Sequence, residues 1–166
     1  AEPVSGELRA FVDFLGTLPR GLKSHQVKAA VHFLTVGNGA NFSVPGSGKT
    51  TVVLSVFEWL RRQGTVNTLF VVGPPSCFAP WRDEFASVLG RSPSCEILAG
   101  GQVEERQRNY YPIPGELRDL YLTSYQTLQR DVELVKAFFA QRDIKAALVV
   151  DEAHYIKQVS GAWAQA

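Results

Sequence analysis

Residues 43–50 have the types and spacing of a phosphate-binding loop. Their sequence, Ser-Val-Pro-Gly-Ser-Gly-Lys-Thr, follows a short apolar run and precedes a helix-like segment. Glycines allow backbone N–H groups to close around an anion, and a helix that begins at the lysine directs the positive end of its dipole toward phosphates. In such a loop Lys49 reaches the β- and γ-phosphates, and the Thr50 hydroxyl binds Mg²⁺. The pattern predicts nucleotide contacts from Pro45, Gly46, Ser47, Gly48, Lys49, Thr50 and Thr51.

One position of this loop departs from the full phosphate-loop pattern. That pattern begins with glycine, whereas this chain has Ser43. A small residue fits that position, so the nucleotide-binding prediction is kept. The alternative is a flexible Gly/Ser loop that carries an exposed lysine.

A second segment, Asp-Glu-Ala-His at 151–154, offers the chemistry that such a loop needs from elsewhere in the chain. It follows five apolar residues, so the Asp151 carboxylate is expected at the end of a strand. Mg²⁺ takes one or two carboxylates, which predicts that Asp151 holds the metal. Glu152 is the candidate general base that polarises a water toward the γ-phosphate, so Lys49 and Glu152 are the predicted catalytic residues. The alternative is a solvated helix start, where acidic side chains favour the N-terminal dipole.

The composition fits a single soluble globular domain. The chain has 166 residues, 45% of them apolar, and a net charge of +1, so it has no global basic field and any contact with nucleic acid has to be local. Cys77 and Cys95 lack metal-site spacing and fit two ordinary thiols in a reducing compartment. Because we find neither a membrane-length apolar run nor a signal-peptide pattern, we expect no membrane association. The expected location is the bacterial cytoplasm and nucleoid, or the nucleus, rather than outside the cell.

Helix-like and strand-like segments alternate along the chain. Apolar residues at helical spacing predict helices over 8–15, 25–36, 51–62, 78–89 and 131–142, and a charged, exposed helix is expected over 102–109. Short apolar runs predict strands over 41–44, 68–72, 95–98, 119–123 and 146–150. The alternation implies a three-layer α/β fold, with a mostly parallel sheet and helices on both faces. Ligands of such sheets bind beyond the carboxyl ends of the strands, so residues 43–50 and 151–152 are expected to meet at one edge.

Several segments together resemble helicase superfamily two, and within it the Swi/Snf-type, DEAH-containing ATPases. Residues 46–50 and 151–154 are similar to motifs I and II of that superfamily, and residues 71–85, with a proline and then Trp-Arg-Asp-Glu-Phe, to its motif Ia. Residues 122–128 are similar to its Thr-Thr-Tyr-Glu-x-Leu segment. The most specific match is Asp-Glu-Ala-His-Tyr-Ile-Lys at 151–157, similar to Asp-Glu-Ala-His-x-Ile-Lys. The loop differs, because the Swi/Snf branch usually has Met-Gly-Leu-Gly-Lys-Thr.

This resemblance implies a RecA-like P-loop fold and hydrolysis of ATP with Mg²⁺. The whole chain, 1–166, would be the first of two lobes, with a helical extension over 1–21, and we expect the second lobe to be absent from it. Gln26, in the Leu-Lys-Ser-His-Gln segment, would recognise adenine. An arginine finger from the second lobe contributes about 10³–10⁵-fold in rate. The chain by itself is therefore expected to bind ATP and double-stranded DNA weakly and to be nearly inactive as an ATP hydrolase.

In this family, motif Ia and the Thr-Ser-Tyr segment lie along the nucleic-acid backbone. The resemblance implies phosphate contacts from Ser76, Arg82, Thr123 and Ser124, and side chains of these types do make such contacts. The alternative is turn and cap chemistry, which Ser and Thr favour at such positions. Two other functions stay open: another P-loop NTPase, although the guanine-binding Asn-Lys-x-Asp is missing, and a non-catalytic RecA-like interaction domain.

Overall fold

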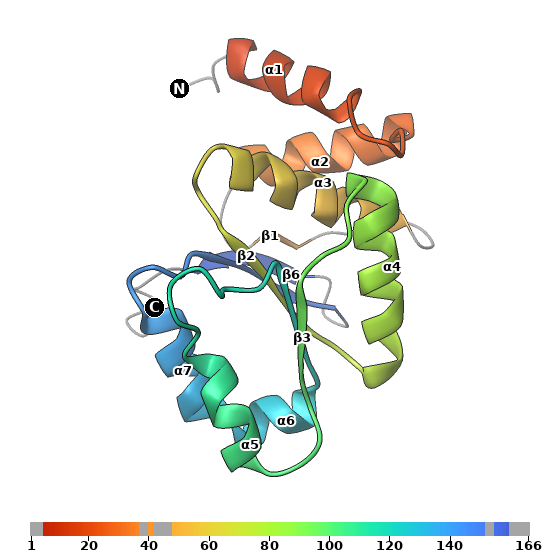
Figure 1. Cartoon of the computed structure of the whole chain (residues 1–166). Helices are drawn as coiled ribbons and strands as arrows, with labels where there is room; N and C mark the ends of the chain where they lie inside the picture. The colour runs from red at the N-terminus through yellow and green to blue at the C-terminus, as the bar shows by residue number, and fades with distance from the viewer. Residues whose placement is uncertain (1–4, 37–39, 42–47, 152–154, 160–166) are drawn as a thin grey trace.

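The computed structural model describes residues 5–36, 40–41, 48–151 and 155–159, with side chains over 6–35 and 48–151. In this part of the chain, a six-stranded sheet of order β1-β6-β5-β2-β4-β3 forms the middle layer (Figure 1). The strands are β1 (Ala40–Asn41), β2 (Thr68–Val72), β3 (Cys95–Leu98), β4 (Leu120–Thr123), β5 (Ala146–Val150) and β6 (Tyr155–Val159). Strands β5, β2, β4 and β3 are parallel neighbours, whereas β6 is antiparallel to both β5 and β1. The predicted mostly parallel α/β sheet is confirmed, and β6 is an additional strand.

Helices cover both faces of this sheet, as predicted (Figure 1). On one face lie α2 (Ser24–Val36), α3 (Gly48–Arg62) and α4 (Phe78–Leu89), and α1 (Ser5–Leu15) packs on the outside of α2 and α3 (Figure 1). On the other face lie α5 (Val103–Gln107), α6 (Tyr125–Arg130) and α7 (Val132–Ala140). Two short 3₁₀ turns, η1 (Pro75–Cys77) and η2 (Arg108–Tyr110), lead into α4 and out of α5.

The sheet separates two hydrophobic cores, and β2 contributes to both. Leu69 and Val71 pack with α3 and α4, whereas Phe70 and Val72 pack with α7. Alternate residues of a strand point to opposite faces, so a strand that is covered on both sides has to be apolar throughout. Burial on both faces is therefore the reason that the uninterrupted apolar run over 68–72 correctly predicts a central strand.

Helix α3 is enclosed more completely than its sequence pattern indicates. The pattern predicts one buried face, but every residue from Thr51 to Glu58 is buried. Burial of a charged residue requires partners. Glu58 has them: Arg61 donates two hydrogen bonds to its carboxylate at 2.9 Å, and Arg91 donates one at 3.0 Å.

The predicted exposed helix over 102–109 is wrong in one respect. Arg106 on α5 is only 5% exposed, because its guanidinium donates to both carboxylate oxygens of the buried Asp131, at 2.7 and 2.8 Å. Tyr110 donates a third hydrogen bond to Asp131, at 2.7 Å. The cluster fixes the start of α7 against the segment that follows β3.

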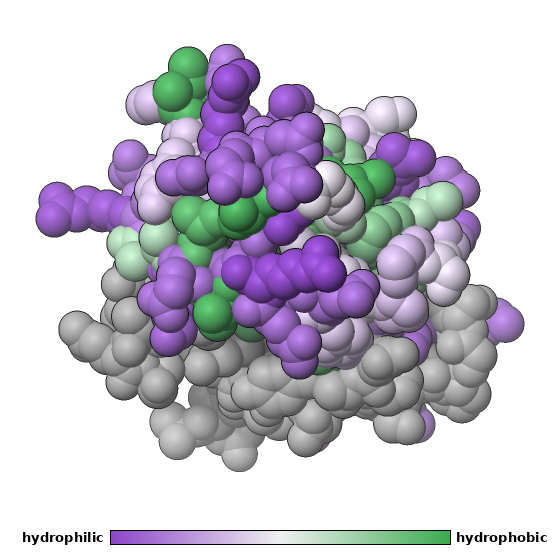
Figure 2. All heavy atoms as spheres, turned by 90° about the horizontal axis from the view of Figure 1, so that it is seen from below, coloured by the Kyte–Doolittle hydropathy of each residue, from purple (hydrophilic) through white to green (hydrophobic). Residues whose placement is uncertain are grey.

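The surface over α5 and α7 is mostly hydrophilic. Figure 2, which views the molecule from that side, shows hydrophobic residues scattered among hydrophilic ones. Among the described residues, none of the helices combines the length and the apolar content that crossing a membrane requires.

Candidate functional site

Lys49 and Asp151, which are distant in sequence, lie together at the carboxyl edge of the sheet. Asp151 follows β5 directly, and its backbone N–H donates to the Val72 carbonyl of β2 at 2.8 Å. Lys49 lies in the first turn of α3, and its Nζ is 3.2 Å from Asp151 Oδ1. The prediction that the two segments meet at one edge is therefore confirmed for these two residues.

The Asp151 carboxylate is suited to binding a cation. Its Oδ1 atom is buried, and although Lys49 approaches it as an ion pair, no donor among the described residues forms a well-directed hydrogen bond to it. A buried carboxylate oxygen without hydrogen bonds is costly unless a cation compensates its charge. Thr50, which is half-buried beside Lys49, adds a hydroxyl oxygen. These groups match the oxygen ligands that Mg²⁺ prefers.

Gly73 and Cys77 also lie beside Asp151, and the sequence pattern did not mark either of them as a site residue. Gly73 follows β2, and a Cβ atom placed on it would lie 2.8 Å from Cys77 Sγ and 3.1 Å from Asp151 Cβ. Any larger residue at position 73 would have to displace the Cys77 or Asp151 side chain. Burial, together with the charge of Asp151 and a hydrogen bond to it, raises the pKa of Cys77 to about 11. The available sequence signal was a glycine at the end of a strand, where close backbone approach is common.

Gln26, the predicted adenine-binding residue, contacts the start of α3. It is 8% exposed, and its Nε2 donates to the Gly48 carbonyl at 3.4 Å. Its Oε1 accepts a hydrogen bond from the Lys23 backbone N–H at 2.8 Å. The structure therefore brings Gln26 next to the first turn of α3, and its role toward adenine stays a prediction.

Thr51 does not offer its side chain to a ligand. It is 2% exposed, and its hydroxyl accepts a hydrogen bond from Arg20 at 3.3 Å. Arg20 also pairs with Glu84 on α4. Any contribution of Thr51 to nucleotide binding therefore has to come from its backbone.

The four predicted nucleic-acid residues divide into two pairs. Ser76 on η1 and Arg82 on α4 are exposed and are available to a partner. Thr123 is fully buried, and its hydroxyl donates to the Leu98 carbonyl of the neighbouring strand at 2.7 Å. Ser124 is 7% exposed and caps α6, where it accepts from the Thr127 N–H at 3.1 Å. The Thr123 and Ser124 hydroxyls thus have strand and cap partners within the chain, as the alternative interpretation expects, and their phosphate contacts stay predictions.

Four predicted site residues lie outside the described part of the chain: Pro45, Gly46, Ser47 and Glu152. Their roles as nucleotide contacts and as general base stay predictions. Within the described residues, no three His, Cys, Asp or Glu side chains gather as they would around a metal held by protein ligands alone. This is compatible with Mg²⁺, which keeps several waters.

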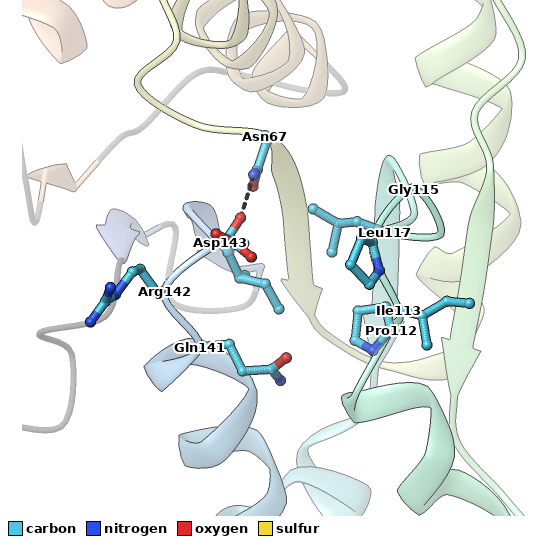
Figure 3. A pocket seen from close by; sticks show the side chains of 10 residues that line it. Asn67, Pro112, Ile113, Gly115, Leu117, Gln141, Arg142 and Asp143 are labelled. Atoms are coloured by element: carbon cyan, nitrogen blue, oxygen red, sulfur yellow. Dashed lines mark hydrogen bonds between the residues drawn. The ribbon is translucent and has the colours of Figure 1, made fainter.

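A hollow of about 490 Å³ lies at the opposite edge of the sheet, among residues that precede β2, β4 and β5 (Figure 3). On one side of the hollow, Asn67 joins the end of the segment before β2 to the loop before β5. Its Nδ2 donates to the Asp143 carbonyl at 2.7 Å, and its Oδ1 accepts from the Lys145 N–H at 2.9 Å. Pro112, Ile113 and further apolar residues form the facing wall. Ligands of parallel sheets bind at the carboxyl edge, so the candidate site is the one that contains Lys49 and Asp151.

The family model described as type III restriction enzyme, res subunit (ResIII), matches residues 24–165. This chain belongs to that family. The match extends from the start of α2 past Asp151 and makes the chain a helicase-type ATPase lobe of superfamily two. A search of curated proteins finds no significant match.

Solved structures are similar to this chain, and one of them matches it over most of its length. It is the SWI2/SNF2 ATPase core of Sulfolobus solfataricus, solved in complex with double-stranded DNA, with a TM-score of 0.54 and 19% sequence identity. The match covers 76% of this chain and 25% of the other, so this chain spans about a quarter of that length. The likeness confirms the RecA-like α/β fold.

Proposed function

We propose that this chain is the ATP- and Mg²⁺-binding first lobe of a Swi/Snf-like, nucleic-acid-dependent ATPase that acts on double-stranded DNA. The observation that carries the proposal is the 3.2 Å contact between Lys49 Nζ and Asp151 Oδ1. A lysine at the start of a long helix and a carboxylate at the end of a parallel strand form the pair that a metal–triphosphate complex needs. Each compensates the charge of the other until phosphate and metal take over both contacts.

In this proposal each residue of the site binds a different part of the metal–nucleotide complex. Lys49 holds the β- and γ-phosphates, and the first N–H groups of α3, which lack intrahelical acceptors, add hydrogen bonds with the helix dipole behind them. Thr50 and Asp151 hold the metal, which when bound neutralises the charge that develops on the transferred phosphoryl group. Glu152 orients the attacking water and accepts its proton. Gln26 holds the adenine, with its amide fixed by Gly48 and Lys23.

A second lobe completes the site in this proposal. Superfamily-two ATPases, which this chain resembles in its motifs, bind ATP between two RecA-like lobes. An arginine finger contributes about 10³–10⁵-fold to such reactions. The isolated lobe is accordingly expected to bind nucleotide weakly and to hydrolyse it very slowly.

The DNA-facing residues of the proposal are Ser76 and Arg82. Both are exposed: Ser76 lies on η1, the turn that also carries Cys77, and Arg82 lies on α4, which follows that turn directly. Arginine side chains and serine hydroxyls bind phosphate oxygens without regard to sequence. Double-stranded DNA is chosen because the similar SWI2/SNF2 core was solved with it. A DNA-dependent enzyme acts where DNA is, so the proposed location is the cytoplasm at the nucleoid, or the nucleus.

The test is a nucleotide-dependent shift in unfolding. A ligand at about 100 times its Kd stabilises the folded state by about 2.7 kcal/mol. We expect excess ATP with Mg²⁺ to raise the melting temperature of the native chain, and to raise it more than GTP does. Lys49→Ala should abolish the shift, whereas Lys28→Ala, at an exposed lysine of α2, should keep it. No shift in the native chain, or an equal shift in Lys49→Ala, would show that the site is wrongly assigned.

A further inference from the structure

We propose that Cys77 is a positioning residue for Asp151. Its thiol donates a hydrogen bond to the Asp151 carboxylate and so keeps the other oxygen, Oδ1, directed toward Lys49 and the metal. The inference rests on the proposed function, because it assigns a device to the same site.

Close packing at the end of β2 places the thiol against the carboxylate. The point where a Cβ atom of Gly73 would lie is 2.8 Å from Cys77 Sγ, 3.1 Å from Asp151 Cβ and 3.5 Å from Asp151 Oδ2. The sulfur and the carboxylate therefore share the space that the missing side chain leaves open. Cys77 itself is held by η1, since its N–H donates to the Pro74 carbonyl at 2.9 Å.

The two oxygens of Asp151 face different neighbours. Oδ2 lies on the side of Gly73, 3.5 Å from the point where its Cβ would lie, whereas Oδ1 is 3.2 Å from Lys49 Nζ. A hydrogen bond to one oxygen restrains rotation of the carboxylate about its Cβ–Cγ bond. Partners of this kind orient metal ligands, and their loss typically costs about 10–100-fold in metal affinity or activity.

The thiol is a suitable donor for this contact. A cysteine thiol, with an ordinary pKa of about 8.5, carries its proton at neutral pH and can donate it to a carboxylate oxygen. A neutral donor stabilises the carboxylate without adding a second positive charge that would compete with the metal.

Cys95 is a matched control within the same chain. It is also half-buried, and burial raises its pKa too. It lies on β3, and its charged neighbours are Arg82, Glu96 and Arg118 rather than Asp151. The two thiols thus differ in whether they contact the proposed site.

The first measurement is infrared spectroscopy of the S–H stretching band, which needs no nucleotide. The Cys95→Ala variant reports Cys77 alone, and Cys77→Ala reports Cys95. We expect the Cys77 band at lower wavenumber than the Cys95 band, and we expect Asp151→Asn to raise it. A Cys77 band that Asp151→Asn leaves in place would show that the hydrogen bond does not exist and would overturn the inference.

The second measurement is the affinity for Mn²⁺ with ATP, followed by electron paramagnetic resonance of the metal, which takes the same oxygen ligands as Mg²⁺. We expect Cys77→Ala to weaken binding about 10-fold or more. Cys77→Ser, which keeps a donor, should restore most of the affinity, and Cys95→Ala should leave it unchanged. Urea unfolding of each variant verifies the fold.

The outcomes separate the two proposals. If the native chain binds the metal–nucleotide and Cys77→Ala binds it equally well, the positioning role is wrong and the proposed function stands. If the native chain binds no metal–nucleotide, the proposed function fails and the positioning role fails with it.

Discussion

Replacing Arg106 by methionine should strongly destabilise the protein without touching the candidate site. The guanidinium is the main partner of Asp131: it donates at 2.7 and 2.8 Å, and the two side chains are 6% and 0% exposed. It also donates to the carbonyls of Gly100 and Gly101, which have φ of 77° and 65°. Methionine fills much of the volume but leaves a buried carboxylate with Tyr110 as its remaining hydrogen-bond donor among the described residues.

The size of the effect follows from burial. Removing one partner of a buried ion pair costs about 3–5 kcal/mol, because the other charge is left uncompensated. For a chain of this size, 1 kcal/mol corresponds to about 2–4 °C in melting temperature, so we expect a decrease of about 6–20 °C. The double variant Arg106→Met/Asp131→Leu should recover most of this loss, since apolar replacements of buried pairs are often neutral.

The assay is urea unfolding followed by circular dichroism, with the midpoint and slope fitted for each variant. The control is Arg108→Met, an exposed arginine two residues along the chain, for which a change within about 0.5 kcal/mol is expected. A decrease below about 1 kcal/mol for Arg106→Met, or a double variant no more stable than the single one, would refute the buried-pair interpretation.

Two further predictions concern the site and the pH dependence. Gly73→Ala should abolish the nucleotide-dependent stabilisation and lower the free energy of unfolding by about 1–3 kcal/mol, because its Cβ would lie 2.8 Å from Cys77 Sγ. The control is Gly21→Ala, which has open space around it. Thermal unfolding with and without ATP checks both variants. Burial raises the pKa of Asp131, but hydrogen bonds from Arg106 and Tyr110 outweigh it and leave that pKa below its usual value. Stability should therefore be full above about pH 4 and fall as the pH decreases further. Burial raises the pKa of Tyr110, so stability should also fall above about pH 10. Urea midpoints measured across pH check both limbs. If Arg106→Met kept the same loss of stability at acid pH as the native chain, the role given to Asp131 would be contradicted.

The strands and helices of the central layers were largely predictable from the sequence. Residues 68–72, 95–98 and 146–150 are strands with the predicted bounds, and the predicted helix over 78–89 is α4. These segments carry either continuous apolar runs or a clear helical stripe, and prolines or glycines end several of them. The meeting of Lys49 and Asp151 was also predictable, because parallel strands end at a common edge.

What the sequence could not predict depends on partners that are distant along the chain. Arg106 is buried because Asp131, 25 residues later, accepts its hydrogen bonds. The Thr123 hydroxyl has a partner within the sheet because the register of β3 and β4 brings the Leu98 carbonyl within its reach. Cys77 becomes relevant only because Gly73 lets it approach Asp151. Composition and local pattern do not specify such pairings.

The family match begins at residue 24, but the cooperative folding unit starts earlier. In α1, Phe11, Phe14 and Leu15 are buried, and the rings of Phe11 and Phe14 lie 5.4 Å from the indole of Trp59 on α3. Fully burying each such apolar side chain is worth about 1.5–3 kcal/mol. A truncation at the family boundary would therefore remove a considerable part of the net stability and expose a continuous apolar surface on α3, which favours aggregation. Expression of this lobe should begin before α1.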